Sequence, residues 1–263
     1  MATTRDGRKG RYSAEVLENT PVASGHVLLR LRCPEVVGSA RPGQFLQVRV
    51  TGVGQDPLLR RPICVAYAAG DEMEILVRRA GRGTDLLACE QPGGLVDLLG
   101  PLGHGFTMPA PAERVALVGG RVGIAPLQFL LAAVEAPDRV TVLLGGRSAD
   151  QLPRLPRLAE CAQLRIATDD GSEGFHGHVV HCLADWLSAN TVDRIYGCGP
   201  RAMLVALAQL TMARKIPCEV SVEERMACGF GVCMGCSVPM VSGGYKRACT
   251  EGPVFDVTEV RWE

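Results

Sequence analysis

Four cysteines near the C-terminus are the residues whose type and spacing most directly suggest chemistry. They follow the spacing C-x4-C-x2-C-x12-C and are Cys228, Cys233, Cys236 and Cys249. Three thiolates from one short loop, with a distant fourth, are the pattern that binds a plant-type [2Fe–2S] cluster. Glycines separate the first three cysteines, and they let the backbone turn tightly and direct N–H groups at sulfur. The spacing therefore predicts an iron–sulfur site within residues 221–263.

Two other interpretations of these cysteines remain open. Structural zinc sites usually have two C-x2-C pairs, or one such pair with two histidines. This segment contains one C-x2-C pair and no histidine, so its spacing favours the cluster. The cysteines could also be unrelated and buried as small hydrophobic residues.

The composition limits the classes of function. The 263 residues are enough for two domains, and 47% hydrophobic with 21% charged residues is ordinary for a globular protein. Lysine plus arginine equals aspartate plus glutamate at 28 each, so the chain lacks the basic excess typical of nucleic-acid binding. The N-terminal residues lack the apolar region of a secretory signal, and no apolar run is long enough to cross a membrane. We therefore expect a cytoplasmic protein whose eleven cysteines stay reduced.

The first part of the chain, residues 11–108, has the pattern of an antiparallel β-barrel. Apolar and polar residues alternate over 27–32, 44–50 and 73–79, and turn residues separate these segments. Several short strands without a helical period indicate a small barrel or sandwich. Residues 1–10 are expected to be a short disordered lead.

Residues 113–220 have the alternating pattern of a parallel α/β domain. Strands are predicted at 114–118, 139–144, 164–168, 193–196 and 219–222. Helices are predicted at 127–134, 152–162, 178–189 and 201–214. This alternation predicts a parallel sheet covered on both faces. Residues 109–111 (PAP) are the expected linker, so the chain divides into 11–108, 113–220 and 221–263.

Two glycine-containing turns in the second part are candidates for nucleotide binding. The turn 119–126 (GGRVGIAP) follows a strand and opens a helix, where an open α/β sheet binds phosphates through N–H groups. Cys198, Gly199 and Pro200 end a later strand, at the edge of the sheet that faces the ligand crevice. Cys198 is therefore a candidate neighbour of a nicotinamide ring. Tight packing without a ligand is the alternative for both turns.

Other polar groups carry weaker signals. Paired arginines precede the segment 62–64, and a second basic loop, RRAGRGT, covers 78–84; guanidinium groups suit phosphate, although basic pairs are usually surface residues. Three nearby histidines, His176, His178 and His181, could suggest a metal site, but we favour a structural role for them.

Taken together, these motifs resemble the ferredoxin-NADP reductase superfamily over nearly the full length of the chain. Its R-x-Y-S flavin motif matches residues 61–64, its glycine-rich nucleotide turn matches 119–126, and its C-G-P motif matches 198–200. The C-terminal string EERMACGFGVCMGC, followed by YKRACTEGPVFD, resembles more narrowly the electron-transfer subunits of NAD-dependent (class 1B) dihydroorotate dehydrogenases.

The resemblance implies FAD in the barrel, NAD on the α/β domain and a [2Fe–2S] cluster on the four cysteines. The residues that would contact FAD are Arg61, Pro62, Ile63, Cys64, Leu76, Val77, Arg78, Gly83 and Thr84. Arg61 would pair with the pyrophosphate and Thr84 would cap it. The residues that would contact NAD are Gly119, Gly120, Gly123, Cys198, Gly199 and Pro200. The chain departs from the superfamily at Cys64, where serine is usual, and at Arg121, where glycine is usual.

The implied function is an electron relay in pyrimidine biosynthesis. Electrons from dihydroorotate, oxidised to orotate on a partner subunit that carries FMN, would reach NAD+ through the cluster and FAD, in a heterotetramer with two copies of each chain. The chain itself offers no candidate base for dihydroorotate. Two alternatives remain: a relay subunit of another NAD(P)-linked flavoprotein complex, of sulfhydrogenase or transhydrogenase type, or a zinc-stabilised binding module without enzymatic activity.

Overall fold

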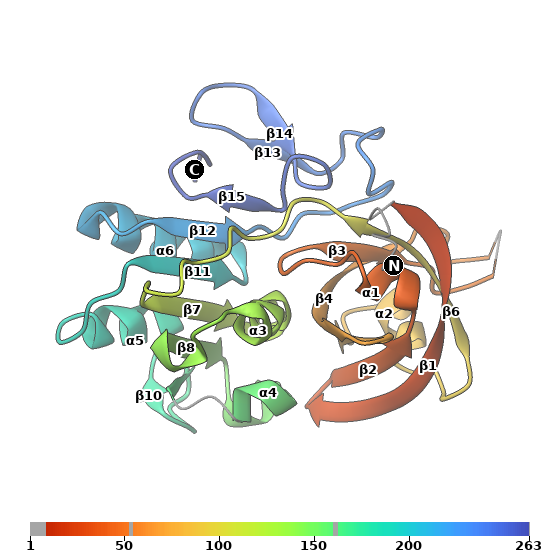
Figure 1. Ribbon diagram of the computed structural model, residues 1–263, viewed down its shortest axis with the longest axis horizontal. Helices are drawn as coiled ribbons and strands as arrows, with labels where there is room; N and C mark the ends of the chain where they lie inside the picture. The colour runs from red at the N-terminus through yellow and green to blue at the C-terminus, as the bar shows by residue number, and fades with distance from the viewer. Residues whose placement is uncertain (1–8, 53–54, 160–162, 263) are drawn as a thin grey trace, which may run out of the picture.

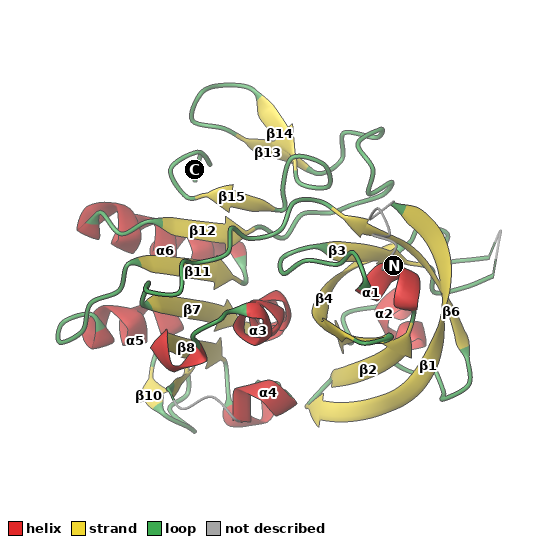
Figure 2. Cartoon of the chain, viewed as in Figure 1, coloured by secondary structure: helices red, strands yellow, loops and turns green. Residues whose placement is uncertain are grey.

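A computed structural model describes residues 9–52, 55–159 and 163–262. Figures 1 and 2 show a barrel on the right, an α/β sheet on the left, and a C-terminal segment across the top of both. Most of the expected N-terminal lead, residues 1–8, and the end of the helix predicted at 152–162, residues 160–162, lie outside the described residues.

The N-terminal part is a closed six-stranded antiparallel barrel with the order β1-β2-β5-β4-β3-β6. Its strands are β1 (Gly10–Ala23), β2 (His26–Arg32), β3 (Phe45–Val48), β4 (Arg61–Ala69), β5 (Glu72–Arg78) and β6 (Leu95–Leu102). Two short helices, α1 (Pro34–Val37) and α2 (Arg82–Leu87), lie in its connections. Alternating side chains such as Leu29, Leu31 and Val77 fill the barrel interior. This confirms the predicted barrel, and two of its strands (β1 and β6) were not predicted individually.

The second part is a sheet with the order β10-β9-β8-β7-β11-β12-β15. Its strands are β7 (Val115–Gly120), β8 (Val140–Gly146), β9 (Leu164–Thr168), β10 (Phe175–His176), β11 (Arg194–Cys198), β12 (Cys218–Ser221) and β15 (Val254–Asp256). Every pair is parallel except β12 with β15. The strands after β7 are added on one side of it as far as β10, and β11 and β12 are then added on its other side. An open α/β sheet binds its ligand at such a switch point in strand order, here between β7 and β11.

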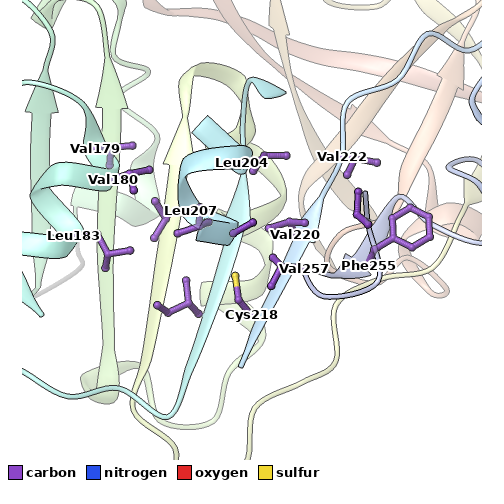
Figure 3. Close-up of a cluster of buried hydrophobic side chains, with 14 of the residues drawn as sticks. Val179, Val180, Leu183, Leu204, Leu207, Cys218, Val220, Val222, Phe255 and Val257 are labelled. Atoms are coloured by element: carbon purple, nitrogen blue, oxygen red, sulfur yellow. The ribbon is translucent and has the colours of Figure 1, made fainter. Parts of the chain in front are cut away.

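Helices cover the faces of this sheet and fix its core. They are α3 (Ile124–Ala133), α4 (Pro156–Ala159), α5 (Val179–Trp186) and α6 (Arg201–Arg214), with 3₁₀ turns η1 (Arg121–Gly123), η2 (Pro137–Arg139) and η3 (Ala149–Gln151). Figure 3 shows side chains of α5 and α6, including Val180, Leu183 and Leu207, beside Cys218 and Val220 of β12. The parallel α/β prediction is therefore confirmed.

The predicted helix 152–162 is wrong over its first residues. Residues 152–155 are irregular, and α4 begins only at Pro156. Pro153 and Pro156 lack an N–H donor and disfavour helical conformation in the residue before them. Proline is tolerated in a first turn, which is why the helix can begin at Pro156.

The C-terminal segment packs on both larger parts of the molecule. A loop that contains the first three cysteines follows β12, and a hairpin of β13 (Ser237–Pro239) and β14 (Tyr245–Arg247) comes next. β15 then returns to extend the main sheet, with Val220 opposite Phe255. The cysteine loop is thereby held between the barrel and the edge of the sheet.

None of the helices in the described ranges is both long enough and apolar enough to span a membrane.

Candidate functional site

A pocket of about 270 Å³ lies where the barrel, the sheet and the C-terminal segment meet. The barrel contributes residues of β4 and β5, the sheet contributes the turn after β7 and the end of β11, and the C-terminal segment contributes residues 221–226. Six of the nine residues predicted to contact FAD line it: Pro62, Ile63, Cys64, Leu76, Arg78 and Thr84. Side chains of the predicted flavin site thus lie against residues such as Cys198 and Glu223, which come more than 100 positions later in the chain.

The other three predicted FAD residues are placed differently. The side chain of Val77 faces the barrel core, because neighbouring residues of a strand point to opposite faces; only its backbone can reach the pocket. Gly83 lies against Arg61, and a Cβ at Gly83 would come within 2.4 Å of Arg61 Nε. This glycine leaves room for the guanidinium group over α2.

Thr84 organises the loop before it through its hydroxyl group. Thr84 Oγ1 donates to the carbonyl of Gly81 at 3.0 Å and accepts from the N–H of Ala80 at 2.9 Å. The predicted capping of a pyrophosphate by Thr84 stays a prediction: its hydroxyl proton is donated to Gly81 here, so the local N–H groups are the donors that remain for a pyrophosphate.

The two predicted nucleotide turns are in direct contact. Gly119 lies opposite Cys198 in the register of β7 with β11. A Cβ at Gly123 would lie 2.1 Å from the carbonyl oxygen of Cys198, and one at Gly199 would lie 3.1 Å from the backbone nitrogen of Gly120. Glycine is needed at these positions because two backbone segments meet there.

A second pocket of about 390 Å³ continues from these turns along the carboxyl ends of β7 and β8. Gly120 and Pro200 line one end, and Arg147 lies beyond them after β8. Arg121 also lines it, and its φ of +53° is in the left-handed region, which explains why glycine is usual there. The pocket therefore offers N–H groups and two guanidinium groups to an elongated anionic ligand.

The histidines near this second pocket make a structural contact. His178 Nδ1 lies 2.9 Å from Asp169 Oδ1, and the ring centroids of His178 and His181 are 5.7 Å apart. In the part of the chain that the structure describes, no three side chains of histidine, cysteine, aspartate or glutamate are grouped to hold a single metal ion.

Glu223 is a pocket residue that the sequence analysis did not identify. Its side chain lies at the mouth of the first pocket, where burial raises the pKa of its carboxyl group against the opposing effect of Arg78 and Arg121. Its position directly after the last parallel strand was the available signal. Burial also raises the pKa of the Cys64 thiol to about 12, and raises that of Cys198 well above its usual value. Both thiols therefore stay protonated at neutral pH, and the carboxyl group of Glu223 is shifted toward its neutral form.

The four predicted cluster cysteines converge as two pairs. The thiol of Cys228 contacts that of Cys233, and the thiol of Cys236 contacts that of Cys249. Cys236 and Cys249 are buried, whereas Cys233 is exposed. A tetrahedral zinc ion needs four ligands around one centre, whereas a two-iron cluster takes two thiolates on each iron. Two neighbouring thiol pairs therefore fit the donor set of a two-iron cluster.

The backbone of the cysteine loop favours thiolate. The N–H of Cys233 lies 3.5 Å from Cys228 Sγ, and the N–H of Gly235 lies 3.5 Å from Cys233 Sγ. Burial opposes ionisation of Cys228, but N–H donors, including those of Phe230 and Val232, lower its pKa to about 6. Thiolate is the form that binds iron, so the donor set suits the group that its spacing predicts.

These features define a class of protein: a flavin-type barrel joined to a nucleotide-binding sheet, with a cysteine loop at their junction. The family model for the iron–sulfur cluster binding domain of dihydroorotate dehydrogenase B matches residues 223–261. The dihydroorotate dehydrogenase B (NAD(+)) electron transfer subunit of Desulforamulus reducens is 39% identical over 96% of this chain and 98% of its own. The corresponding subunit of Geobacillus kaustophilus is 41% identical over 95% of this chain and 98% of its own.

The chain belongs to the family of dihydroorotate dehydrogenase B electron transfer subunits, which confirms the resemblance inferred from the motifs. Solved structures agree on the fold. A chain from the structure of an NADH-dependent reduced ferredoxin-NADP oxidoreductase, described for flavin-based electron bifurcation, superposes with a TM-score of 0.83 at 29% identity, over 95% of this chain and 90% of that one. The Amycolatopsis cytochrome P450 reductase GcoB superposes with a TM-score of 0.64 at 26% identity, over 80% and 68%.

Proposed function

We propose that this chain relays electrons between NAD+ and a partner subunit through FAD and a [2Fe–2S] cluster. It is an NAD-linked oxidoreductase subunit, and the family to which it belongs takes its name from the same task. The partner carries FMN and oxidises dihydroorotate to orotate, and the assembly contains two copies of each chain.

One observation carries the proposal: a single pocket brings together the two predicted cofactor sites and the segment that leads into the cysteine loop. Cys64 of the flavin motif, Gly123 and Cys198 of the nucleotide turns, and Glu223 of the segment that leads to Cys228 all line the same pocket. Electron transfer requires that hydride donor, hydride acceptor and one-electron carrier lie close together, and few other functions would require this adjacency.

The chain's own residues bind and orient the reacting groups. Arg61 lies beside α2, where it can pair with a pyrophosphate, and Gly83 leaves space for it. Gly120 and Arg121 offer an N–H group and a guanidinium group to the dinucleotide in the second pocket. When bound, FAD supplies hydride chemistry and the cluster supplies one-electron chemistry.

Three titratable side chains line the first pocket, and burial raises the pKa of each. They are Cys64, Cys198 and Glu223, and burial favours their neutral forms. In its neutral form each of these groups can donate a hydrogen bond to a bound ring without placing a negative charge beside it. We assign these side chains the role of orienting the rings and excluding water.

The cysteine loop is the proposed exit to the partner. Cys233 is exposed, and the apolar side chains beside it are exposed as well: Phe230 by 54%, Val232 by 73% and Met234 by 53%. Three large apolar side chains around one exposed cysteine are unusual on a monomer surface and suit a protein interface. We propose that the catalytic subunit covers this loop.

Co-expression with the adjacent FMN-containing catalytic subunit tests the proposal. The purified complex is expected to contain FAD, iron and acid-labile sulfide, and to reduce NAD+ with dihydroorotate as the electron donor. The chain alone is expected to oxidise NADH with an artificial acceptor, but not to oxidise dihydroorotate. A chain that contains neither flavin nor iron would contradict the proposal.

A relay subunit in a different complex is the second candidate. The likeness to the NADH-dependent ferredoxin-NADP oxidoreductase chain extends over nearly all of both chains, so the same architecture serves another electron pathway. The partner that co-purifies distinguishes the two. Zinc in place of iron and sulfide would instead indicate the non-enzymatic binding module.

A further inference from the structure

Buried polar atoms without a partner are concentrated beside the cysteine loop. Six buried side-chain nitrogen or oxygen atoms in the described ranges make no hydrogen bond, and three of them are Gln47 Nε2, Gln47 Oε1 and Thr250 Oγ1. Such atoms cost free energy unless a group absent from the protein chain satisfies them. Their location points to a ligand at this loop.

Gln47 is the stronger of the two cases. Its side chain is 0% exposed, and neither end of its amide has a partner. It belongs to β3 of the barrel, opposite Pro62 of the flavin motif. A Cβ placed on Gly229, the residue after Cys228, would lie 2.7 Å from Gln47 Nε2 and 2.5 Å from its Cγ. The amide is therefore pressed against the cysteine loop on the side that faces the flavin barrel.

Thr250 occupies the corresponding place on the other side of the loop. It follows Cys249, and its hydroxyl is buried without a partner. A Cβ on Gly231 would lie 2.9 Å from Thr250 Cγ2 and 3.5 Å from its Oγ1. Two glycines of one loop thus each lie against an uncommitted hydrogen-bond donor.

We propose that Gln47 and Thr250 donate hydrogen bonds to the sulfur atoms of the [2Fe–2S] cluster and thereby raise its reduction potential. The inference rests on the proposed cluster site and adds two tuning residues, one of them from the flavin barrel. Reduction makes the sulfur atoms more negative, so an N–H or O–H donor stabilises the reduced form more than the oxidised form. Gln47 also connects the potential of the cluster to the barrel strand that pairs with the flavin motif.

The Gln47→Leu variant tests this in the full complex. Leucine keeps the apolar volume of the side chain and removes both polar atoms of the amide. We expect the cluster to bind and the equilibrium constant for its reduction to fall by about tenfold, equivalent to about 59 mV for a one-electron couple. EPR-monitored redox titration measures the shift without any assay of activity.

Gln44→Leu is the matched control. The Gln44 amide already donates to the carbonyl of Gly103 at 2.8 Å and accepts from the N–H of Arg41 at 2.9 Å. We expect this variant to lower the melting temperature and leave the potential unchanged.

Pulsed EPR of the reduced complex, labelled with ¹⁵N at glutamine side chains, is expected to show a coupling that Gln47→Leu removes. A buried water in place of the direct bond would give no such coupling.

Thr250→Val and Thr250→Ser make the same test from the other side of the loop. Valine is expected to lower the potential by a smaller amount, and serine to restore it. If Gln47→Leu binds no iron, the reduction potentials of these two variants test the inference instead. An unchanged potential in a fully loaded Gln47→Leu or Thr250→Val complex overturns the inference. A wild-type complex without iron and sulfide would instead overturn the proposed function.

Discussion

Cysteines in two adjoining regions of this protein have thiol pKa values shifted in opposite directions. Cys64 and Cys198 line the pocket between barrel and sheet, where burial keeps them as thiols. Cys228 lies in the loop that leaves the same pocket, and backbone N–H donors lower its pKa to about 6. The same side chain is thus a neutral thiol in one region and, 30 residues after Cys198, a predicted thiolate ligand. The difference lies in the backbone: strands bury the first two cysteines, whereas a glycine-rich loop directs N–H donors at the third.

The largest effect is expected when one predicted cluster ligand in the cysteine loop is replaced. Cys233→Ser is expected to abolish stable cluster binding, because hydroxyl is a poor iron ligand. Electron transfer to the partner should be lost, while NADH still reduces the flavin, since the pocket is not touched. Iron and sulfide content, with stopped-flow flavin reduction, measure both parts. Cys89→Ser replaces another exposed cysteine and is expected to change neither. Loss of flavin reduction in Cys233→Ser would show that the two regions are not separable.

The next largest effect is expected in the reactivity of the pocket thiols. With a pKa of about 12, Cys64 has about a thousandfold less thiolate at pH 8 than an ordinary cysteine of pKa about 8.5. In flavin-free protein, alkylation of Cys64 by iodoacetamide should therefore be slow at pH 8. It should rise about tenfold per pH unit up to pH 11. Peptide mass spectrometry measures the rate, with exposed Cys89 as the reference. A rate that levels off below pH 10 would contradict the assigned environment.

Local pattern was enough to predict the parts of the site that are continuous in sequence. The cysteine spacing, the turn after β7 and the end of β11 are each encoded in one short continuous segment, and each segment lies where the pattern placed it. What the pattern left out depends on contacts between distant segments. Glu223 is a pocket residue only because β12 ends against the barrel. Nothing near Gln47 in sequence indicates that a loop 180 residues later will cover it.

The same distinction explains the errors in the predicted elements. The strand β15 has three residues and is stabilised by pairing with β12, so its own sequence carries little strand signal. The flavin contact of Val77 stays a prediction for its backbone alone, because strand alternation turns its side chain into the barrel core. The helix expected at 152–162 took no account of two prolines, whose backbone restriction delays its start to Pro156.

A moderate effect is expected where the two nucleotide turns touch. Gly123→Ala would place a Cβ 2.1 Å from the carbonyl oxygen of Cys198, so one backbone segment must move. We expect a loss of about 2–3 kcal/mol in the free energy of unfolding, and at least a tenfold loss of NAD+ affinity. Thermal unfolding and NAD+ titration measure the two. Gly38→Ala is the matched control, because Gly38 has a φ of −63° and a nearest contact of 3.5 Å. Unchanged NAD+ affinity in Gly123→Ala would place the dinucleotide elsewhere.

The smallest effect is expected at Arg121, which stands where glycine is usual in the superfamily. Arg121 has a φ of +53°, so Arg121→Gly relieves backbone strain and should raise the free energy of unfolding by about 0.5–1 kcal/mol. It also removes a guanidinium group from the second pocket, and we expect NAD+ to bind about threefold to fivefold more weakly. Lys215→Gly separates the two effects. Lys215 has a φ of +55° at the end of α6 and lies outside the residues that line the pocket, so this variant should gain stability without losing affinity. Equal NAD+ affinity in both variants would show that Arg121 contributes strain and no phosphate contact, and that N–H groups alone hold the dinucleotide at this turn.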